Sequence, residues 1–254
     1  MTISQDSLYR KHLLQRCAEV DHALNELGYD AVLIHSGRPV NRLFDDQHAP
    51  FRAHAPFVAL VPLPFAVDAL LELRVGKRPC LWYCQPKDFW HLPPSDPEAW
   101  WADELDVETV AEPAAWAERF GSARALAAIG APEQLNGLGE GVAINPPALI
   151  HQLAECRTIK TAWEQDCLRH ANCIGARAHQ AAARAFADGA SEHETHLAYL
   201  TAANQDQDQL PYASIVAINE HAAVLHYQHR SPEGPTFPAA FCWMPGRIGT
   251  AMPA

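Results

Sequence analysis

Residues 212–227 read Tyr-Ala-Ser-Ile-Val-Ala-Ile-Asn-Glu-His-Ala-Ala-Val-Leu-His-Tyr, and this stretch combines a strand pattern with two histidines. The apolar, β-rich run at residues 214–218 predicts a buried strand. Residues 219–222 supply polar turn chemistry, and residues 224–227 predict the start of a second strand. His226 lies in that second strand, where its imidazole can project into a site. It is therefore the first residue to consider for a functional role.

Patterns on either side of this stretch predict alternating helices and strands. Apolar residues with a 3.6-residue period, ended by glycines, are typical of amphipathic helices, and short apolar runs bounded by turn residues are typical of strands. Ser191 and Glu194 have the spacing of a capping box. The fold class is therefore α/β (α+β). Helices are expected at residues 8–27, 114–120, 146–155, 163–187 and 192–203, and strands at 30–37, 57–63, 69–75, 79–84 and 125–130, with a hairpin at 76–78.

The composition narrows the class of function. The 254 residues are 48% hydrophobic and 19% charged, as in ordinary globular proteins, and the formal net charge is −11. An acidic chain of this kind argues against nucleic acid or an anionic membrane as the main partner. No apolar run approaches the roughly 20 residues that span a bilayer, and the first residues are polar rather than signal-like. We expect a cytoplasmic protein acting on small molecules or peptides.

The motifs that would indicate a metal or phosphate site do not have the required spacing. The seven scattered cysteines suit a reducing compartment, and Cys80 and Cys84 read as small core residues on one face of a strand. His193 and His196 are three residues apart, whereas the H-E-x-x-H zinc motif needs four. Gly139 belongs to a turn at residues 138–141 that lacks both phosphate-loop spacings. Trp90 belongs to an aromatic and proline-rich loop at residues 86–101, whose large side chains we expect against the core.

Several short strings occur in a characteristic order along the chain. They are residues 33–37, 45–47, 88–91, 160–161 with Glu164, 167–169, 192–200 and, above all, 211–227. Together they resemble the Xaa-Pro dipeptidase (prolidase) family of the creatinase/methionine aminopeptidase "pita-bread" superfamily, in particular the bacterial branch related to organophosphorus acid anhydrolases. The resemblance covers roughly residues 8–237.

The resemblance implies a domain organisation and a chemistry. Residues 1–157 would form a creatinase/prolidase-like N-terminal domain with a mixed sheet, used in homodimerisation, and residues 158–237 the first part of a pita-bread metallopeptidase domain. The family hydrolyses Xaa-Pro dipeptides with two divalent metals, commonly Mn²⁺, held by two aspartates, a histidine and two glutamates. His226 matches the family histidine outside this ligand set, which stabilises the substrate carbonyl or the tetrahedral intermediate.

Residues 238–254 depart from the family pattern. The metal-binding aspartates should follow soon after His226, but no Asp, Glu or His occurs after Glu233. Read in a shifted frame, the codons of residues 241–246 permit Leu-Leu-Asp-Ala-Gly, and those of residues 250–253 permit Gly-Tyr-Ala. The tail is therefore interpreted as a frameshift product that truncates the family sequence. On this hypothesis the chain binds no metal of its own and is inactive.

Two other functions remain open. The chain could be a non-catalytic module whose N-terminal domain dimerises with a full-length relative. It could also be an unrelated α/β protein that binds a small ligand through its Trp- and His-rich loop at residues 82–101. His221 and His229 lie close to His226 in sequence, but we interpret them as surface histidines rather than a metal cluster.

Overall fold

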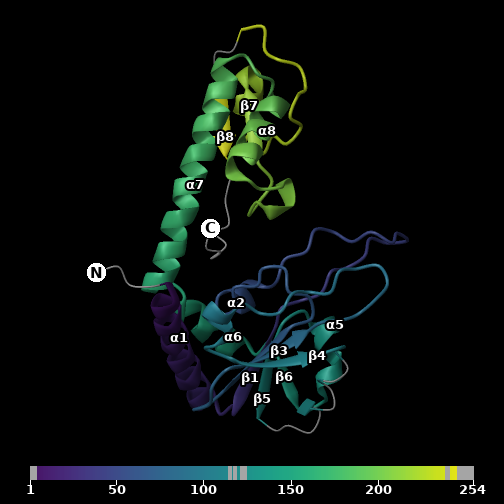
Figure 1. The fold of residues 1–254 in the computed structure, drawn as a ribbon, viewed down its shortest axis with the longest axis vertical. Coiled ribbons are helices and arrows are strands. Elements are labelled where there is room, and N and C mark those ends of the chain that lie inside the picture. Colours follow the sequence, from purple (N-terminus) through teal and green to yellow (C-terminus); the bar gives the residue numbers. More distant parts are fainter. Residues whose placement is uncertain (1–4, 114–115, 117–118, 121–124, 238–240, 245–254) are drawn as a thin grey trace. The chain divides into compact units, whose positions relative to one another are not determined.

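The polypeptide divides into two compact units, residues 1–164 and residues 165–254. The computed structural model describes residues 5–113, 116, 119–120, 125–237 and 241–244 (Figure 1). No helix among these residues is long and apolar enough to cross a membrane.

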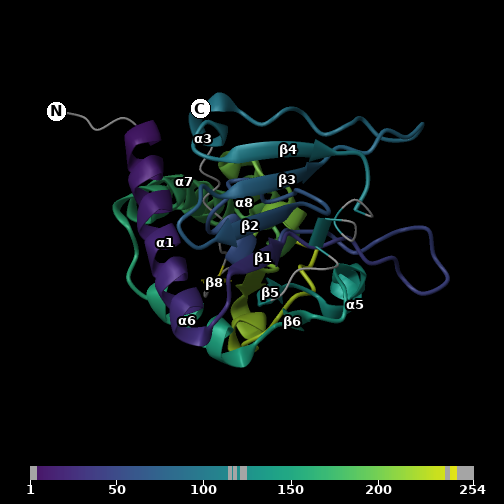
Figure 2. The ribbon, with the colours of Figure 1, turned by 90° about the horizontal axis from the view of Figure 1, so that it is seen from below.

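The first unit is built on a six-stranded mixed sheet with the order β4-β3-β2-β1-β5-β6 (Figure 2). Its strands are β1 (Ala31–His35), β2 (Leu70–Arg74), β3 (Cys80–Cys84), β4 (Asp106–Val110), β5 (Leu126–Ile129) and β6 (Val142–Ile144). Its helices are α1 (Gln5–Leu27), α2 (Ala55–Val58), α3 (Ala99–Ala102), α5 (Pro132–Leu135), the 3₁₀ helix η1 (Asn136–Leu138) and α6 (Pro147–Cys156). The expected α/β class with a mixed sheet is confirmed.

The central strand β1 is buried along its whole length. It pairs antiparallel with β2 and parallel with β5, and β5 pairs parallel with β6. Both faces of β1 are covered, which explains why its sequence is a continuous apolar run rather than an alternating one. Leu33, Leu70 and Leu126 join the core on one face with Trp116 and Phe120.

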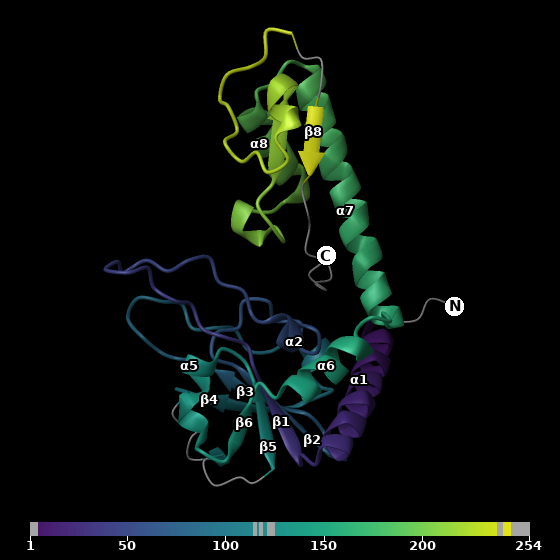
Figure 3. The same cartoon turned by 180° about the vertical axis from the view of Figure 1, so that it is seen from behind.

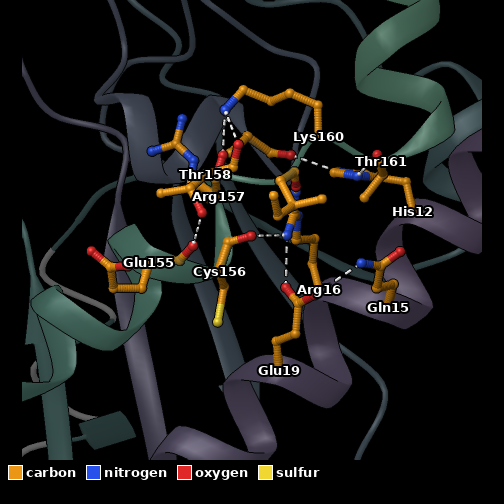
Figure 4. Close-up of polar contacts among 12 residues, drawn as sticks. His12, Gln15, Arg16, Glu19, Glu155, Cys156, Arg157, Thr158, Lys160 and Thr161 are labelled. Atoms are coloured by element: carbon orange, nitrogen blue, oxygen red, sulfur yellow. Dashed lines mark hydrogen bonds and ion pairs between the residues drawn. The ribbon is translucent and has the colours of Figure 1, made fainter.

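Helix α1 is tied to the segment after α6 by the buried guanidinium of Arg16 (Figure 4). One terminal nitrogen donates to the Glu19 carboxylate at 2.7 Å and to the backbone carbonyl of Cys156 at 2.6 Å. The other donates to the carbonyl of Ile159 at 2.9 Å and to the carboxylate of Glu164 at 2.6 Å. Arg16 therefore satisfies the carbonyl of Cys156 at the C-terminal end of α6 and the carbonyl of Ile159 in the segment that follows.

Two aromatic residues of α1 make further buried contacts. Tyr9 donates its hydroxyl to the carbonyl of Leu60 at 2.7 Å. His12 Nε2 lies 2.8 Å from the carbonyl of Ala59, so this nitrogen carries the proton and Nδ1 accepts from the hydroxyl of Thr161 at 2.9 Å. Burial lowers the pKa of His12 and favours this neutral form.

The second unit contains most of the long helix α7 (Ala162–Ala187), α8 (Glu192–Ala203) and a two-stranded antiparallel sheet (Figure 3). The sheet pairs β7 (Ile215–Ile218) with β8 (Phe241–Met244), and the 3₁₀ helices η2 (Gln207–Gln209) and η3 (Asn219–Ala223) flank β7. Ser191 and Glu194 form the expected capping box. Ala178 and Ala182 of α7 pack with Tyr199 and Ala203 of α8.

Most of the expected elements are present, but the strand predicted at residues 57–63 is wrong. Pro56 stands in the first turn of α2, and Val61 donates its N–H to the carbonyl of Phe57, as in a helical turn. The apolar side chains of this segment are buried by helical rather than strand geometry. Strands β4 and β6 were not predicted. The helix expected at residues 114–120 lies largely outside the described residues.

The aromatic loop after β3 only partly follows its prediction. Trp101 is buried, as expected, whereas Phe89, Trp90 and Leu92 are each more than 80% exposed. The carboxylate of Asp88 accepts from the backbone N–H groups of Trp90 and His91 and fixes a turn there. The expectation that Trp90 packs against the core is wrong, because the local turn directs this segment outward.

Candidate functional site around Glu192 and the His226 turn

The segment after β7 turns instead of forming the strand predicted at residues 224–227. Asn219, with a left-handed φ of 54°, opens the 3₁₀ helix η3. Val224 then donates its N–H to the carbonyl of His221, and Tyr227 donates to the carbonyl of Val224. These local bonds replace the strand pairing, so the strand prediction is wrong and His226 lies in a turn.

The carboxylate of Glu192 organises this turn. Glu192 stands at the first position of α8 and is 2% exposed. One oxygen accepts from the backbone N–H of Ile218 at 2.9 Å and from His221 Nδ1 at 2.8 Å. The other accepts from the backbone N–H of Ser231 at 2.7 Å. One buried side chain therefore fixes the end of β7, the 3₁₀ helix η3 and the chain beyond the turn.

Tyr227 completes the cluster. Its ring stacks on His221 with centroids 4.5 Å apart and meets His229 edge-on at 5.4 Å. It is 8% exposed, and its hydroxyl also hydrogen-bonds to Glu192. Two causes raise the pKa of Tyr227 to about 12: burial is the larger, and this bond to a carboxylate is the next.

The charge of Glu192 is held by its donors. Burial alone would raise the pKa of this carboxyl group. The bonds from the Ser231 N–H, the His221 ring, the Ile218 N–H and the Tyr227 hydroxyl outweigh burial and hold the pKa below its usual range. The anion is thus the native form, and its position at the N-terminus of α8 favours it further.

A buried histidine lies one turn further along α8 than Glu192. His196 is 4% exposed, and its Nδ1 has no hydrogen-bond partner within the described part of the chain. Burial, then repulsion from Arg230, lowers the pKa of His196 to about 4. Arg230 has a left-handed φ of 55° and donates to the carbonyl of Ser214 at 3.2 Å. His196 is therefore a neutral structural residue.

His226 differs from these histidines. Its side chain is exposed, next to the buried Tyr227. Sequence reasoning identified His226 but missed Glu192, which it placed only within a helix. The missed signal is an acidic residue directly after an N-cap serine, followed by a buried strand and a histidine. His221 was predicted to be a surface histidine, and its side chain is 40% exposed, but its ring belongs to the Glu192 cluster.

The described residues do not fit the two metal ions that the resemblance implies. Among the side chains of residues 6–113, 116, 119–120 and 125–237, no group of three or more His, Cys, Asp or Glu residues lies close enough to hold a metal ion. His221, with His226 and His229, does not form such a group, and the same is true of His193 and His196. No catalytic step is therefore assigned to a metal held by these residues.

Comparison with known proteins defines the class of this fold. Residues 7–154 match the family model "Xaa-Pro dipeptidase, N-terminal domain", and residues 166–238 match "Metallopeptidase family M24". Among solved structures, aminopeptidase P from E. coli with the inhibitor Pro-Leu has a TM-score of 0.64 at 20% identity, covering 90% of this chain and 56% of that one. The prolidase from Pyrococcus horikoshii has a TM-score of 0.58 at 14% identity, covering 86% and 56%. The structural likenesses show the fold alone, which is the pita-bread fold of aminopeptidase P and prolidase.

Relatives that are similar in sequence define the family of the chain more narrowly than the fold does. The chain is 36% identical over 236 residues to the Xaa-Pro dipeptidase of Stenotrophomonas maltophilia, covering 92% of this chain and 53% of the relative. It is 38% identical over 233 residues to that of Xanthomonas axonopodis pv. citri, covering 91% and 52%. The chain belongs to the Xaa-Pro dipeptidase family. It spans about half the length of these curated relatives.

Proposed function

We propose that the chain supplies the N-terminal domain (residues 1–157) and the first part of the catalytic domain (residues 158–237) of an enzyme that hydrolyses Xaa-Pro dipeptides, with His226 as its substrate-carbonyl-binding residue. The observation that carries this role is the contrast between His226 and its neighbours. His221 and His196 are engaged or buried, whereas His226 is exposed on a turn that Glu192 holds in place. A residue that meets substrate must be reachable and also positioned.

The chemistry of the substrate suits a histidine. The nitrogen of the scissile bond is that of proline and carries no hydrogen, so the carbonyl oxygen is the polar group through which the scissile bond can be recognised. A ring N–H of His226 can donate to this oxygen. The same bond strengthens as negative charge develops on the oxygen in the tetrahedral intermediate. Glu192 and Tyr227 would act through the backbone, by positioning the turn.

Divalent metal ions would supply the hydroxide nucleophile and polarise the carbonyl in the intact family. Because the described residues offer no ligand group for them, we propose that the 254-residue chain alone does not hydrolyse dipeptides. The test is proline release from Leu-Pro by the purified chain with added Mn²⁺, with a metal-free sample as the control. Mn²⁺-dependent release that survives further purification would contradict this part of the proposal.

Resequencing the gene tests the frameshift directly. A confirmed reading frame without family-like sequence downstream in the shifted frame would contradict that hypothesis.

The role of His226 has its own test. Titration of the chain with Leu-Pro, followed through the ring ¹⁵N signals of its histidines, should shift His226 selectively at millimolar dipeptide. His226→Ala removes the response, whereas the matched exposed substitution His193→Ala leaves it. A titration in which only His193 or His229 responds would reject His226 as the contact.

Dimerisation is a second candidate function, which the exposed side chains of the first unit favour. Phe44, Phe89, Trp90 and Leu92 are large apolar residues that are each at least 82% exposed, and exposed apolar surface is typical of interaction sites. We propose that the first unit forms a homodimer in the cytoplasm; the six cysteines between residues 17 and 173, which are free thiols, suit that compartment. Light scattering should give twice the chain mass, and Phe44→Ser with Trp90→Ser should restore the monomer. A monomer in the unsubstituted chain rules this function out.

A further inference from the structure

The first unit contains a cavity of about 440 Å³ that the dipeptidase proposal does not use. One wall is a stripe of α6 in which Ile150, Leu153, Ala154 and Arg157 recur at i, i+3, i+4 and i+7. This spacing places all four on one side of the helix, while Leu149 faces the core. The stripe is apolar until its last residue, which carries a guanidinium.

The opposite walls come from the ends of other elements. The β5 end contributes Ile129 and Gly130, the β6 end contributes Asn145, and the start of α2 contributes Pro56 beside His54. Strands β1, β5 and β6 run parallel, so these residues stand at the carboxyl edge of the parallel part of the sheet. In open α/β sheets this edge is where ligands bind.

The cavity is held open by its own hydrogen bonds. The side chain of Asn145 donates to the carbonyl of Gly130 at 2.7 Å and accepts from the N–H of Gly130 at 3.1 Å. This reciprocal pair joins the ends of β5 and β6, and Asn145 adopts a left-handed φ of 49° to make it. A preformed cavity of this size, mostly apolar with a few polar groups, has the features of a small-molecule site.

Two polar groups at the cavity lack partners within the described residues. Nε of Arg157 and Nε2 of His54 are both screened from solvent, and neither makes a hydrogen bond there. In Figure 4 the contact drawn to Arg157 reaches its backbone carbonyl, which accepts from the Lys160 ammonium. Arg157 as a whole is half-buried, but its screened Nε lacks an acceptor, and a carboxylate is the acceptor that a guanidinium prefers.

His54 supports the same ligand chemistry. Burial, then repulsion from His35, lowers the pKa of His54, so its ring is neutral at pH 7 and can donate a single hydrogen bond. Its Nε2 is 2.9 Å from the position that a Cβ on Gly37 would occupy, so glycine at that position leaves space for the ring. One anionic group near Arg157, with an apolar body along α6, would match the polar and apolar parts of the cavity.

We propose that this cavity binds a small branched aliphatic carboxylate, with the carboxylate on Arg157 and the aliphatic part against Leu153, Ala154 and Ile129. The occupant is a free acid of few carbon atoms rather than a peptide segment, because the cavity has the volume of a small-molecule site. This cavity lies within the first unit, and its ligand is independent of the role of His226.

The test uses 4-methylpentanoate as the probe, its neutral amide as the comparison ligand, and the full chain. Amide signals of residues 129–131, 145 and 150–157 should shift on titration, with a Kd on the order of 0.1–1 mM for a ligand of this size. The amide should bind at least tenfold more weakly. If the acid shifts no signal in these ranges, or if acid and amide bind equally, the proposal is overturned.

Matched variants locate the binding. Arg157→Gln should weaken 4-methylpentanoate at least tenfold, whereas Arg42→Gln, at an exposed arginine of the same unit, should not change it. Ala154→Phe fills the cavity from an exposed helix position and should abolish binding, whereas Ala148→Phe, exposed on α6 but outside the lining, should bind normally. Equal effects within either pair would show that the acid binds elsewhere. Because these signals lie in the first unit, this test and the Leu-Pro titration can fail separately.

Discussion

His221 Nδ1 lies 2.8 Å from the carboxylate of Glu192, and this pair joins the 3₁₀ helix after β7 to the first residue of α8. The carboxylate is buried and takes two backbone N–H groups as well. The pair therefore controls the geometry of the turn on which His226 stands.

Removing the charge of Glu192 should loosen this turn. Glu192→Gln keeps the shape of the side chain but weakens the bonds from Ile218, His221 and Ser231, so we expect a loss of roughly 2–3 kcal/mol of unfolding free energy in the second unit. Urea denaturation followed through the histidine and amide signals of residues 165–237 measures it. Glu220→Gln, on an exposed neighbouring carboxylate, is the control and should have little effect.

The pH dependence of Glu192 has a defined sign. Its folded pKa lies below the unfolded value near 4.5, so its contribution to stability is present above pH 4.5 and is lost as the pH falls through the folded pKa. Acid unfolding of the second unit should therefore become shallower below pH 4.5 in Glu192→Gln. If the dependence of unfolding free energy on pH below 4.5 were the same in Glu192→Gln as in the unsubstituted chain, the lowered pKa of Glu192 would be contradicted.

His196 should make the second unit sensitive to pH in a higher window. Its folded pKa is about 4, against 6.5 for the ordinary group. The unfolded chain therefore binds the proton first, and unfolding free energy falls as the pH drops from 6.5 towards 4, by roughly 3 kcal/mol. His196→Gln should flatten this slope, whereas His193→Gln, at an exposed neighbour, should keep it. Equal slopes in all three chains would refute the prediction.

Substitutions at the adjacent residues Tyr227 and His226 should have different effects on stability, because we assign a structural role to Tyr227 and a substrate-binding role to His226. Tyr227→Phe removes the hydroxyl bond to Glu192 and should destabilise the second unit by about 1–2 kcal/mol. His226→Ala removes an exposed ring and should change unfolding free energy by less than about 0.5 kcal/mol. If His226→Ala destabilised the unit as much as Tyr227→Phe, its role would be structural.

Arg16 should be essential for the stability of the first unit. Arg16→Met leaves two carbonyls without their donor and leaves the carboxylate of Glu164 with only the backbone N–H of Thr161, and removing one partner of a buried ion pair costs about 3–5 kcal/mol. The control is Arg10→Met on the same helix, whose pair with Glu104 is 3.6 Å long with Arg10 65% exposed; its loss should be below about 1 kcal/mol. Guanidinium denaturation of both variants compares them.

Gly37 should tolerate no side chain. Its φ is +102°, and an added Cβ would lie 2.9 Å from His54 Nε2, so Gly37→Ala should destabilise the first unit by about 2–3 kcal/mol and displace the His54 ring. Gly28 also has a positive φ, of +76°, but has no atom within 4 Å of an added Cβ. Gly28→Ala should therefore lose only about 1 kcal/mol. Thermal unfolding of the pair distinguishes crowding from backbone strain.

Local sequence determined the elements whose stabilising contacts are made between residues close together in the chain. The capping box of Ser191 and Glu194, the apolar period of α1 and the hairpin between β2 and β3 all follow from residues close together in the chain, and each is confirmed. The strings that resemble Xaa-Pro dipeptidases were also visible without a structure. The domain boundaries at residues 157 and 237, the nature of the tail and the role of His226 stay predictions.

Tertiary structure decided where distant groups compete with local propensity. Residues 57–63 have a strand composition, but Pro56 starts a helical turn whose carbonyls at Ala59 and Leu60 accept bonds from α1. Residues 224–227 likewise read as a strand. Glu192, more than twenty residues earlier, binds Ile218 and His221 and bends the chain before a strand can pair. A buried carboxylate must have its donors satisfied, and that requirement, which no short stretch of sequence displays, placed His226 on a turn.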